Sequence, residues 1–109
     1  MKLVKCIIRT EKIDELLKAI QRLVSGMTIS EVRGHGRQKG YMVVYRNSEY
    51  EVALLPKVMF EIVIDDNKVE DVVGLVTQST RTGAIGDGRI YIHEVEAALH
   101  IRTGFMDLG

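Results

Sequence analysis

At 109 residues with 46% hydrophobic content, the sequence predicts a single domain over residues 1–109 with one modest core. Fifteen basic residues balance fifteen acidic ones, which argues against general binding to nucleic acid or to membrane surfaces. The single cysteine, Cys6, excludes a disulfide within the chain, and neither a secretory signal nor an apolar stretch of about 18 residues is evident, so we expect a cytoplasmic protein without membrane insertion.

The first half of the chain predicts a strand, a helix and a second strand. Residues 3–9 are rich in β-branched side chains and indicate a strand. The helix follows, with Thr10 as its expected cap and Gly26 just beyond its end. Alternation resumes at Thr28, and this strand is expected to end near 34–36. The apolar face of the helix consists of residues at helical spacing: Ile13, Leu16, Leu17, Ile20 and Val24.

The second half repeats this plan. Val58–Ile64 alternates as a strand, and Asn67 with Glu70 predicts a capping-box-like helix start. This helix is expected to end near Arg81, before a strand over Arg89–His93. The resulting order predicts an α+β, ferredoxin-like βαββαβ sandwich with both helices on one face of an antiparallel sheet. Its other face is partly apolar, which favours association between copies of the chain.

A long connection separates the two halves. The sequence RQKGYMVVYRNSEYEVALLPK, residues 37–57, is too polar and irregular for a core segment. It is also too long for an ordinary connection in so small a domain, and loops of this length are usually functional. We therefore expect a regulatory loop at about 37–54.

Three short segments combine glycines with basic side chains, namely GHGRQKG at 34–40, TGAIGDGRI at 82–90 and HIRTG at 100–104. Glycines let backbone N–H groups approach an anion, and arginine and lysine neutralise phosphate charge. Neither of the two longer segments matches a P-loop or a Gly-x-Gly-x-x-Gly pattern. They predict a polyphosphate site, against the alternative that they are turns with solvated charges. The basic residues concerned are Arg37, Lys39, Arg89 and Arg102.

The same segments carry a family resemblance that extends over nearly the whole chain. The segments that resemble PII signalling proteins in order and spacing are GHGRQKG, YRNSEY at 45–50, LLPKV at 54–58, TGAIGDGRIYI at 82–92 and IRTG at 101–104. The resemblance implies a homotrimer of ferredoxin-like subunits. It further implies that ATP or ADP binds in the clefts between subunits and that the long loop contacts partner proteins.

The resemblance also implies roles for individual residues in the nucleotide site. Phosphates would be held by Arg37, Gly86, Gly88 and Arg89, and by Arg102 from the adjacent subunit. The adenine and ribose end would be lined by Ile7, Thr28, Glu61 and Val63. The remaining members of the expected nucleotide-binding set are Gly34, Gly36, Gln38, Thr82, Asp87 and His100.

A second ligand, 2-oxoglutarate, is implied beside the nucleotide. Gln38 would bind a Mg²⁺ ion shared by ATP and the acid, and Lys57 would pair with a carboxylate. Arg9, Lys39 and the backbone of Gly36 and Gly40 would complete this pocket. Because ADP lacks the γ-phosphate that completes the metal shell, the two nucleotides would favour different loop arrangements.

In the loop, the resemblance implies that Tyr50 is a uridylylation site and that Arg46 contacts partners. Those partners would be an ammonium transporter or the enzymes and regulators of nitrogen assimilation, and the protein itself would not be an enzyme. Departures from the family pattern are Asn47, Ser48 and Ala84, and His100, which replaces a phosphate-binding arginine. Since histidine carries its full charge only in acid, we predict weaker ATP binding that improves on acidification, and a shift toward ADP or AMP.

Three other functional interpretations compete with the nitrogen-regulatory one. A PII-like adenine-nucleotide sensor serving carbon or metal-ion homeostasis would also fit the departures at His100, Ala84 and Asn47. A histidine phosphotransferase of the same fold lacks a nucleophile with an evident base. An RNA-binding module would need an aromatic strand motif, whereas Tyr and Phe together supply only six residues, four and two respectively.

Overall fold

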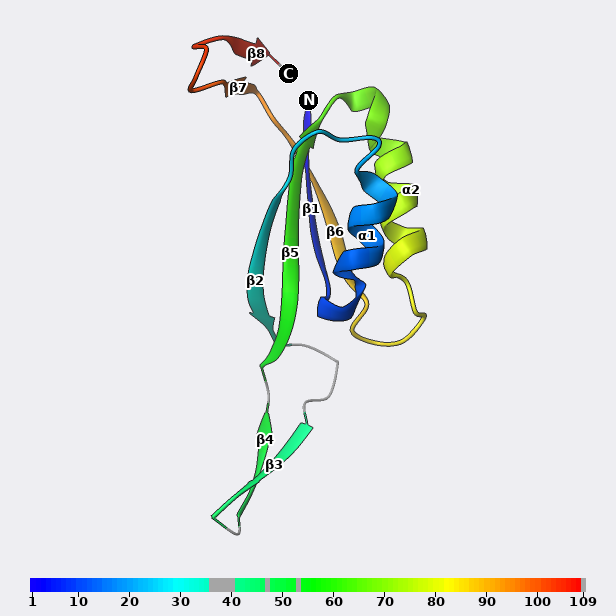
Figure 1. Cartoon of the computed structure of the whole chain (residues 1–109), viewed down its shortest axis with the longest axis vertical. Coiled ribbons are helices and arrows are strands. Elements are labelled where there is room, and N and C mark those ends of the chain that lie inside the picture. The colour runs from blue at the N-terminus through cyan, green and yellow to red at the C-terminus, as the bar shows by residue number, and fades with distance from the viewer. Residues whose placement is uncertain (36–40, 47, 53, 109) are drawn as a thin grey trace.

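The computed structural model describes residues 1–35, 41–46, 48–52 and 54–108 (Figure 1). The strands are β1 (Lys2–Arg9), β2 (Thr28–Gly34), β3 (Tyr41–Tyr45), β4 (Ser48–Val52), β5 (Leu55–Ile64), β6 (Gly88–Glu94), β7 (Ala97–Leu99) and β8 (Met106–Leu108). The helices are α1 (Ile13–Ile20) and α2 (Val69–Thr80), each preceded by a 3-10 turn, η1 (Thr10–Lys12) and η2 (Asp66–Lys68).

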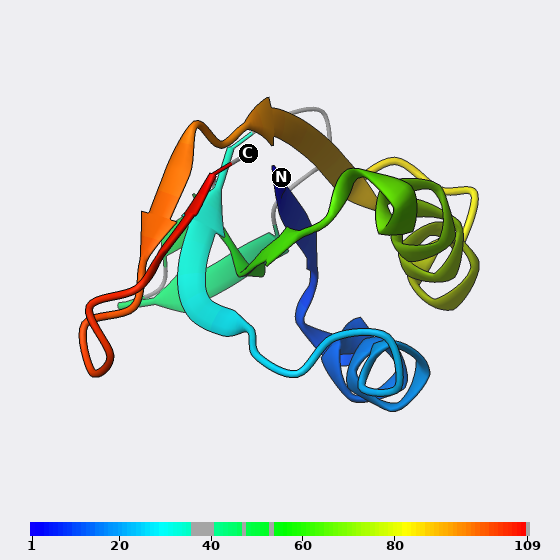
Figure 2. The same ribbon diagram turned by 90° about the horizontal axis from the view of Figure 1, so that it is seen from above.

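The main sheet has four strands in the order β2-β5-β1-β6, and every neighbouring pair is antiparallel. Both helices lie on the same face of this sheet (Figure 2). Taken along the chain, the elements of this layer follow the order β1-α1-β2-β5-α2-β6. The predicted α+β, ferredoxin-like arrangement is therefore confirmed.

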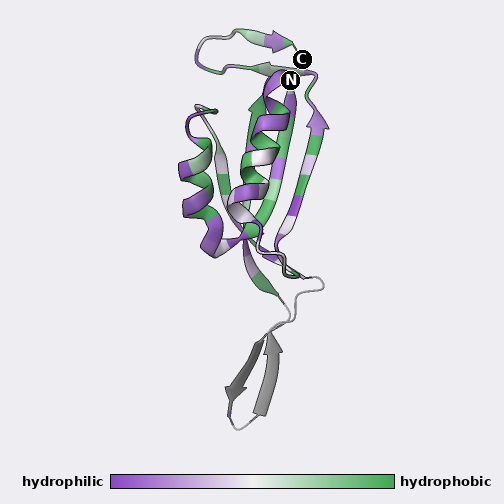
Figure 3. Ribbon diagram, turned by 90° about the vertical axis from the view of Figure 1, so that its right-hand side faces the viewer, coloured by the Kyte–Doolittle hydropathy of each residue, from purple (hydrophilic) through white to green (hydrophobic). Residues whose placement is uncertain are grey.

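The core lies between the helices and the sheet. Alternate residues of β1 and β5 point toward the helices, which is why the burial pattern of both strands has a period of two. Each helix carries both hydrophobic and hydrophilic residues, as expected for amphipathic helices on a sheet (Figure 3). The most deeply buried side chains are Phe60, Ile8, Leu16, Ile20, Val4, Val72, Val76 and Cys6. Burial raises the pKa of the Cys6 thiol to about 11.

The predicted helix caps are wrong. Thr10 and Asn67 lie inside the 3-10 turns, and neither helix start has a side-chain cap hydrogen bond. Backbone bonds close these turns instead; for example, the Lys68 N–H donates to the carbonyl of Asp65 at 3.0 Å. The start of each helix therefore needs no capping box.

The first helix is also shorter than predicted. It ends at Ile20, and the N–H groups of Leu23 and Val24 both donate to the Ile20 carbonyl in a closing turn. Val24 remains in the core although it lies outside the helix. The second helix ends at Thr80, directly before Arg81, as predicted.

The long connection contains regular structure that the sequence reading missed. Strands β3 and β4 pair as an antiparallel hairpin, with Tyr41 opposite Val52 and Tyr45 opposite Ser48. At the tip, Arg46 is exposed and has a positive φ of 52°. β5 begins at Leu55 rather than at Val58. The interpretation of this connection as irregular is therefore wrong for the β3–β4 hairpin, which extends beyond one end of the main sheet (Figure 1).

A second hairpin that was not predicted, β7–β8, lies at the opposite end of the molecule, near both termini (Figure 1). Its strands have only three residues each. Large apolar side chains are exposed in and around it: Leu99 at 57%, Ile101 at 98%, Phe105 at 73%, Met106 at 58% and Leu108 at 79%. Among the described residues, no helix is both long and apolar enough to cross a membrane.

Candidate functional site

Two cross-strand pairs place predicted site residues on the sheet face that the helices leave uncovered. Ile7 on β1 lies opposite Arg89 on β6, and Arg9 lies opposite Lys57 on β5. Ile7 falls between the buried residues Cys6 and Ile8, so its side chain points away from the helices. Two cations, one at the end of β1 and one near the start of β5, therefore lie side by side at one end of the sheet.

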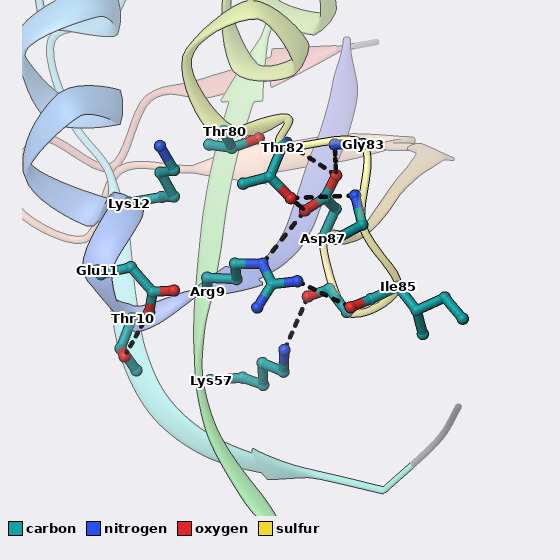
Figure 4. Close-up of polar contacts among 12 residues, drawn as sticks. Arg9, Thr10, Glu11, Lys12, Lys57, Thr80, Thr82, Gly83, Ile85 and Asp87 are labelled. Carbon is teal, nitrogen blue, oxygen red and sulfur yellow. Dashed lines mark hydrogen bonds and ion pairs between the residues drawn. The ribbon is translucent and has the colours of Figure 1, made fainter. Parts of the chain in front are cut away.

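The segment 82–88, which we call the glycine loop, connects α2 to β6 beside these cations. Its internal structure is organised by the carboxylate of Asp87 (Figure 4). Asp87 Oδ2 accepts hydrogen bonds from the N–H groups of Thr82 at 2.9 Å and Gly83 at 2.8 Å. Its other oxygen, Oδ1, accepts a bond from the hydroxyl of Thr82, and the same hydroxyl oxygen accepts the N–H of Ala84 at 3.2 Å. The carboxylate thus fixes the path of the loop.

Both cations donate into the glycine loop (Figure 4). Arg9 Nε donates to Asp87 Oδ1 at 3.2 Å, and Arg9 Nη2 donates to the carbonyl of Ile85 at 2.8 Å. Lys57 Nζ donates to the carbonyl of Gly86 at 2.8 Å. The ends of two sheet strands are therefore bonded to a loop that lies far from them in sequence.

These contacts change the proton affinities of two groups. Hydrogen bonds from the Thr82 side chain and backbone, with smaller effects from Gly83 and Arg9, hold the pKa of Asp87 well below its usual range. Burial, and then the positive charge of Arg9, lowers the pKa of Lys57. The Asp87 carboxylate is therefore ionised at every pH near neutrality.

Gly88 is the point where the loop comes closest to the sheet. Its φ is +105°, and a Cβ built there would lie 1.7 Å from the carbonyl oxygen of Ile7. Only glycine permits this approach, because any other side chain would overlap the backbone of β1. Gly86, at φ 104°, also lies in the region that favours glycine. The glycine at position 88 therefore lets the loop pack directly against β1.

An open groove of about 550 Å³ lies along the glycine loop. The predicted site residues that line it are Ile7, Gly34, Lys57, Gly86, Asp87, Gly88 and Arg89. His35 and the exposed side chain of Ile85 also contribute to its wall. Its chemistry, glycine backbone beside arginine and lysine, suits a polyanion.

The remaining predicted residues gather at the other end of the sheet. Thr28 and Glu61 are cross-strand partners and line a second pocket together with the half-exposed Val63. A neighbouring pocket shares Gly26 and Val63 with it and is bordered by His100.

His100 lies in the β7–β8 hairpin, where its Nε2 is 3.1 Å from Asp107 Oδ2. The backbone of His100 also closes the hairpin turn, accepting the N–H of Gly104 at 2.8 Å and donating to the Phe105 carbonyl at 2.9 Å. Arg102 is exposed in this turn. Asp107 was missed by sequence reasoning, because nothing in a seven-residue separation shows that a carboxylate returns to the histidine.

One chain thus divides the predicted nucleotide site between its two ends. The glycine loop lies at the lower end of the main sheet in Figure 1, whereas the hairpin with His100 and Arg102 lies at the upper end. The structure does not bring these two sets together within one chain. The predictions for Gly36, Arg37, Gln38, Lys39 and Gly40 lie outside the described residues.

Two loop residues and the metal prediction can be placed in part. Tyr50 belongs to β4, and Arg46 lies at the tip of the β3–β4 hairpin. Among the residues that the structure describes, no three His, Cys, Asp or Glu side chains are placed to hold a metal ion. The predicted metal-binding residue, Gln38, is not among those described.

Comparison with known proteins shows which family this chain resembles. The family described as "Nitrogen regulatory protein P-II" matches residues 1–105. Among similar proteins, the nitrogen regulatory protein P-II of Nostoc punctiforme is 52% identical over 105 residues, covering 95% of this chain and 94% of that protein. The corresponding protein of Haemophilus influenzae is 44% identical with the same coverage. The nitrogen regulatory protein GlnK of Escherichia coli is 41% identical over 108 residues, covering 98% of this chain and 96% of GlnK.

The molecule is a small α+β signalling protein with a groove beside its glycine loop. The chain belongs to the P-II family of nitrogen regulatory proteins. The resemblance inferred from the five sequence segments is thereby confirmed. Membership in a family of regulators favours a signalling role over catalysis.

Proposed function

We propose that this protein binds ATP and ADP and, according to which is bound, regulates proteins of nitrogen assimilation through its long loop at about 37–54. The observation that carries the proposal is the glycine loop held against two sheet cations, with Arg89 exposed at its end. Glycine backbone and cationic side chains that line the same groove suit the phosphates of a nucleotide. The family supports a regulatory role, and the nucleotide is our inference from the groove.

The site is proposed to lie between copies of the chain. Because the glycine loop and the hairpin with His100 and Arg102 lie at opposite ends of one chain, a pocket that contains both needs two copies. Head-to-tail contacts of this kind form a ring when the rotation between copies closes, as it would in the expected homotrimer. Apolar side chains exposed on the uncovered sheet face, such as Val63 at 48% and Tyr91 at 42%, would be covered in such an assembly.

A second ligand, 2-oxoglutarate, is proposed beside the phosphates. Lys57 borders the groove and would pair with a carboxylate of the acid. Gln38, Lys39 and Gly40 would supply the Mg²⁺ ligand and the rest of the pocket. A hard cation such as Mg²⁺ takes oxygen ligands from phosphate and carboxylate together, so ATP would support this pocket and ADP would not. Each nucleotide would then stabilise a different loop arrangement.

The partners are proposed to be cytoplasmic surfaces of an ammonium transporter, or the enzymes and regulators of nitrogen assimilation, with neither nucleic acid binding nor membrane insertion. Arg46 supports this role because it is exposed at the tip of the projecting β3–β4 hairpin (Figure 1). Tyr50 is proposed as the uridylylation site on the same hairpin. A Tyr50→Phe variant that still accepted a uridylyl group would contradict this assignment.

Calorimetric titration with ATP, ADP and AMP tests the proposal, with and without Mg²⁺ and 2-oxoglutarate, on protein sized by light scattering. We expect a trimer that binds adenine nucleotides and that binds the acid only with Mg²⁺ and ATP. A monomer without nucleotide affinity would refute the proposal. A trimer that binds nucleotide but never the acid would favour the alternative, a PII-like sensor of carbon or metal-ion homeostasis.

A further inference from the structure

We infer that Arg9 and Asp87 form a brace that holds the glycine loop in shape for nucleotide, so that Arg9 is a positioning residue for phosphate binding. This inference rests on the proposed function. It adds a role to the one that family resemblance implies for Arg9.

The geometry of the guanidinium group carries the first step. Arg9 uses Nε for the carboxylate of Asp87 and Nη2 for the carbonyl of Ile85, at 3.2 and 2.8 Å. The two acceptors lie on different parts of the same loop, so a single planar side chain fixes the separation between them. A lysine could not reproduce this fork, because its three donors share one nitrogen.

The carboxylate carries the second step. Each oxygen of Asp87 accepts two hydrogen bonds: Oδ1 from Arg9 and the Thr82 hydroxyl, and Oδ2 from the N–H groups of Thr82 and Gly83. A carboxylate offers about four acceptor positions, so this one is fully used inside the protein. The side chains of Arg9 and Asp87 are only 15% and 23% exposed. The Asp87 carboxylate therefore has no acceptor position left for another donor, and its role is internal to the loop.

The position of the brace carries the third step. Asp87 directly precedes Gly88, whose backbone lies against Ile7, and Arg89 follows. Loss of the brace at Asp87 would therefore alter the backbone beside the groove where phosphates are proposed to bind. Arg9 would act on nucleotide affinity through this backbone even in the absence of the acid.

The test is a double-mutant cycle on ATP affinity, measured by calorimetry without 2-oxoglutarate. We expect Arg9→Gln and Asp87→Asn each to weaken ATP binding about tenfold. The ATP affinity of the double variant should be no more than about twofold lower than that of the single variant that binds ATP less tightly. Arg9→Lys should recover only part of the loss. The matched control is Arg22→Gln, because Arg22 is exposed in the turn after α1 and takes part in none of the ion pairs among described residues. It should bind ATP like the wild type.

Two results would overturn the inference. Arg9→Gln could leave ATP affinity unchanged and remove only the binding of the acid, which would make Arg9 a direct ligand. Alternatively, the two losses could multiply in the double variant, which would show that the residues act independently.

Failure of the proposed function is distinguishable from failure of the brace. If the wild type bound no adenine nucleotide, the proposed function would be wrong. The double-mutant cycle would then be measured on the free energy of unfolding in urea. Non-additive destabilisation by Arg9→Gln and Asp87→Asn would then support the brace, and additive destabilisation would exclude it. If Arg9→Gln did not fold, the Arg9→Lys and Asp87→Asn pair would complete the cycle.

Discussion

The two turns that carry the predicted phosphate-binding groups are built very differently. In the glycine loop, Asp87 accepts four hydrogen bonds and two strands donate cationic side chains to the loop. In the β7–β8 hairpin, the turn is closed by backbone bonds of His100 and a side-chain bond of Thr103, while neighbouring apolar residues are exposed. One region is organised by long-range contacts within the chain, and the other by local ones.

This difference shows that one half of the proposed shared site, the glycine loop, is already organised within a single chain. The glycine loop keeps its shape without a second copy, because its acceptors are matched by donors from β1 and β5. The hairpin presents Ile101 and Phe105 to solvent, at 98% and 73% exposure, which a second copy would cover. Substitutions in the glycine loop should therefore affect folding and, through the loop backbone, phosphate binding, whereas substitutions in the hairpin should mainly affect ligand binding between copies.

The largest contrast is expected between two glycines. Gly88→Ala should lower the free energy of unfolding by about 3 kcal/mol or more, since a Cβ would overlap the Ile7 carbonyl at a positive φ. Gly104→Ala in the hairpin should cost only about 1 kcal/mol, because its φ is +73° but no atom lies within 4 Å of the added Cβ. Urea unfolding followed by circular dichroism measures both. Equal losses would show that the close contact at Gly88 relaxes without cost.

Acid should weaken the glycine loop through Asp87. Because the pKa of this carboxyl is depressed in the folded state, its contribution to stability is fully present above about pH 4 and is lost as the pH falls below that value. Asp87→Asn should therefore be less stable than the wild type at neutral pH, and the gap should narrow at pH values below about 4. Urea unfolding of both proteins at neutral pH and below about pH 4 measures this difference in the free energy of unfolding. A gap that stayed constant would mean that the ionised carboxylate is not responsible.

At the hairpin, His100→Arg should strengthen ATP binding about tenfold at neutral pH by supplying a permanent charge at the proposed phosphate end. The arginine variant should keep this advantage at every pH near neutrality, because an arginine side chain stays charged there. The nearby charged groups Asp65, Lys68 and Asp107 are present in both proteins. Calorimetric affinities that did not differ would sink the assignment of His100 to the site.

The smallest contrast is between two threonines. Thr82→Val removes a hydroxyl that bonds Asp87 and accepts the Ala84 N–H, and it should cost about 1 kcal/mol. Thr103→Val removes only an exposed acceptor of the Phe105 N–H and should cost less than about 0.5 kcal/mol. Thermal unfolding of both variants at one protein concentration measures the difference. The reverse order would contradict the account of the glycine loop as the more tightly bonded turn.

Much of the fold follows from periodicity in the sequence. Alternation in β1 and β5 and the helical spacing of residues such as Leu16 and Ile20 predict the central layer, because burial imposes those periods. The β3–β4 hairpin was missed because the 37–57 segment as a whole is polar and irregular, although the run YMVVY of β3 contains the β-branched and aromatic residues that favour a strand. The β7–β8 hairpin was missed because three-residue strands carry almost no periodic signal.

The candidate site was predictable in its composition but not in its bonding. Glycines and basic residues in three segments point to an anion, and Lys57, Asp87 and Arg89 do line one groove. The hydrogen bond from Arg9 to Asp87 joins residues 78 positions apart. Such a bond follows from the register of β1 with β5 and β6, which local sequence does not reveal. The same reason explains why the partition of the site between two ends was visible only in the structure.

The single cysteine has a practical consequence for measuring how copies of this chain are arranged. Cys6 is fully buried beneath the helices, and its thiol has a pKa of about 11, so it should react poorly with maleimides in the folded protein. A cysteine introduced at the exposed Lys18 or Arg22, away from the proposed contact between copies, would then take a spin label or fluorophore selectively, without prior removal of Cys6. Label-to-label distances at these two positions would give the spacing between subunits directly in solution.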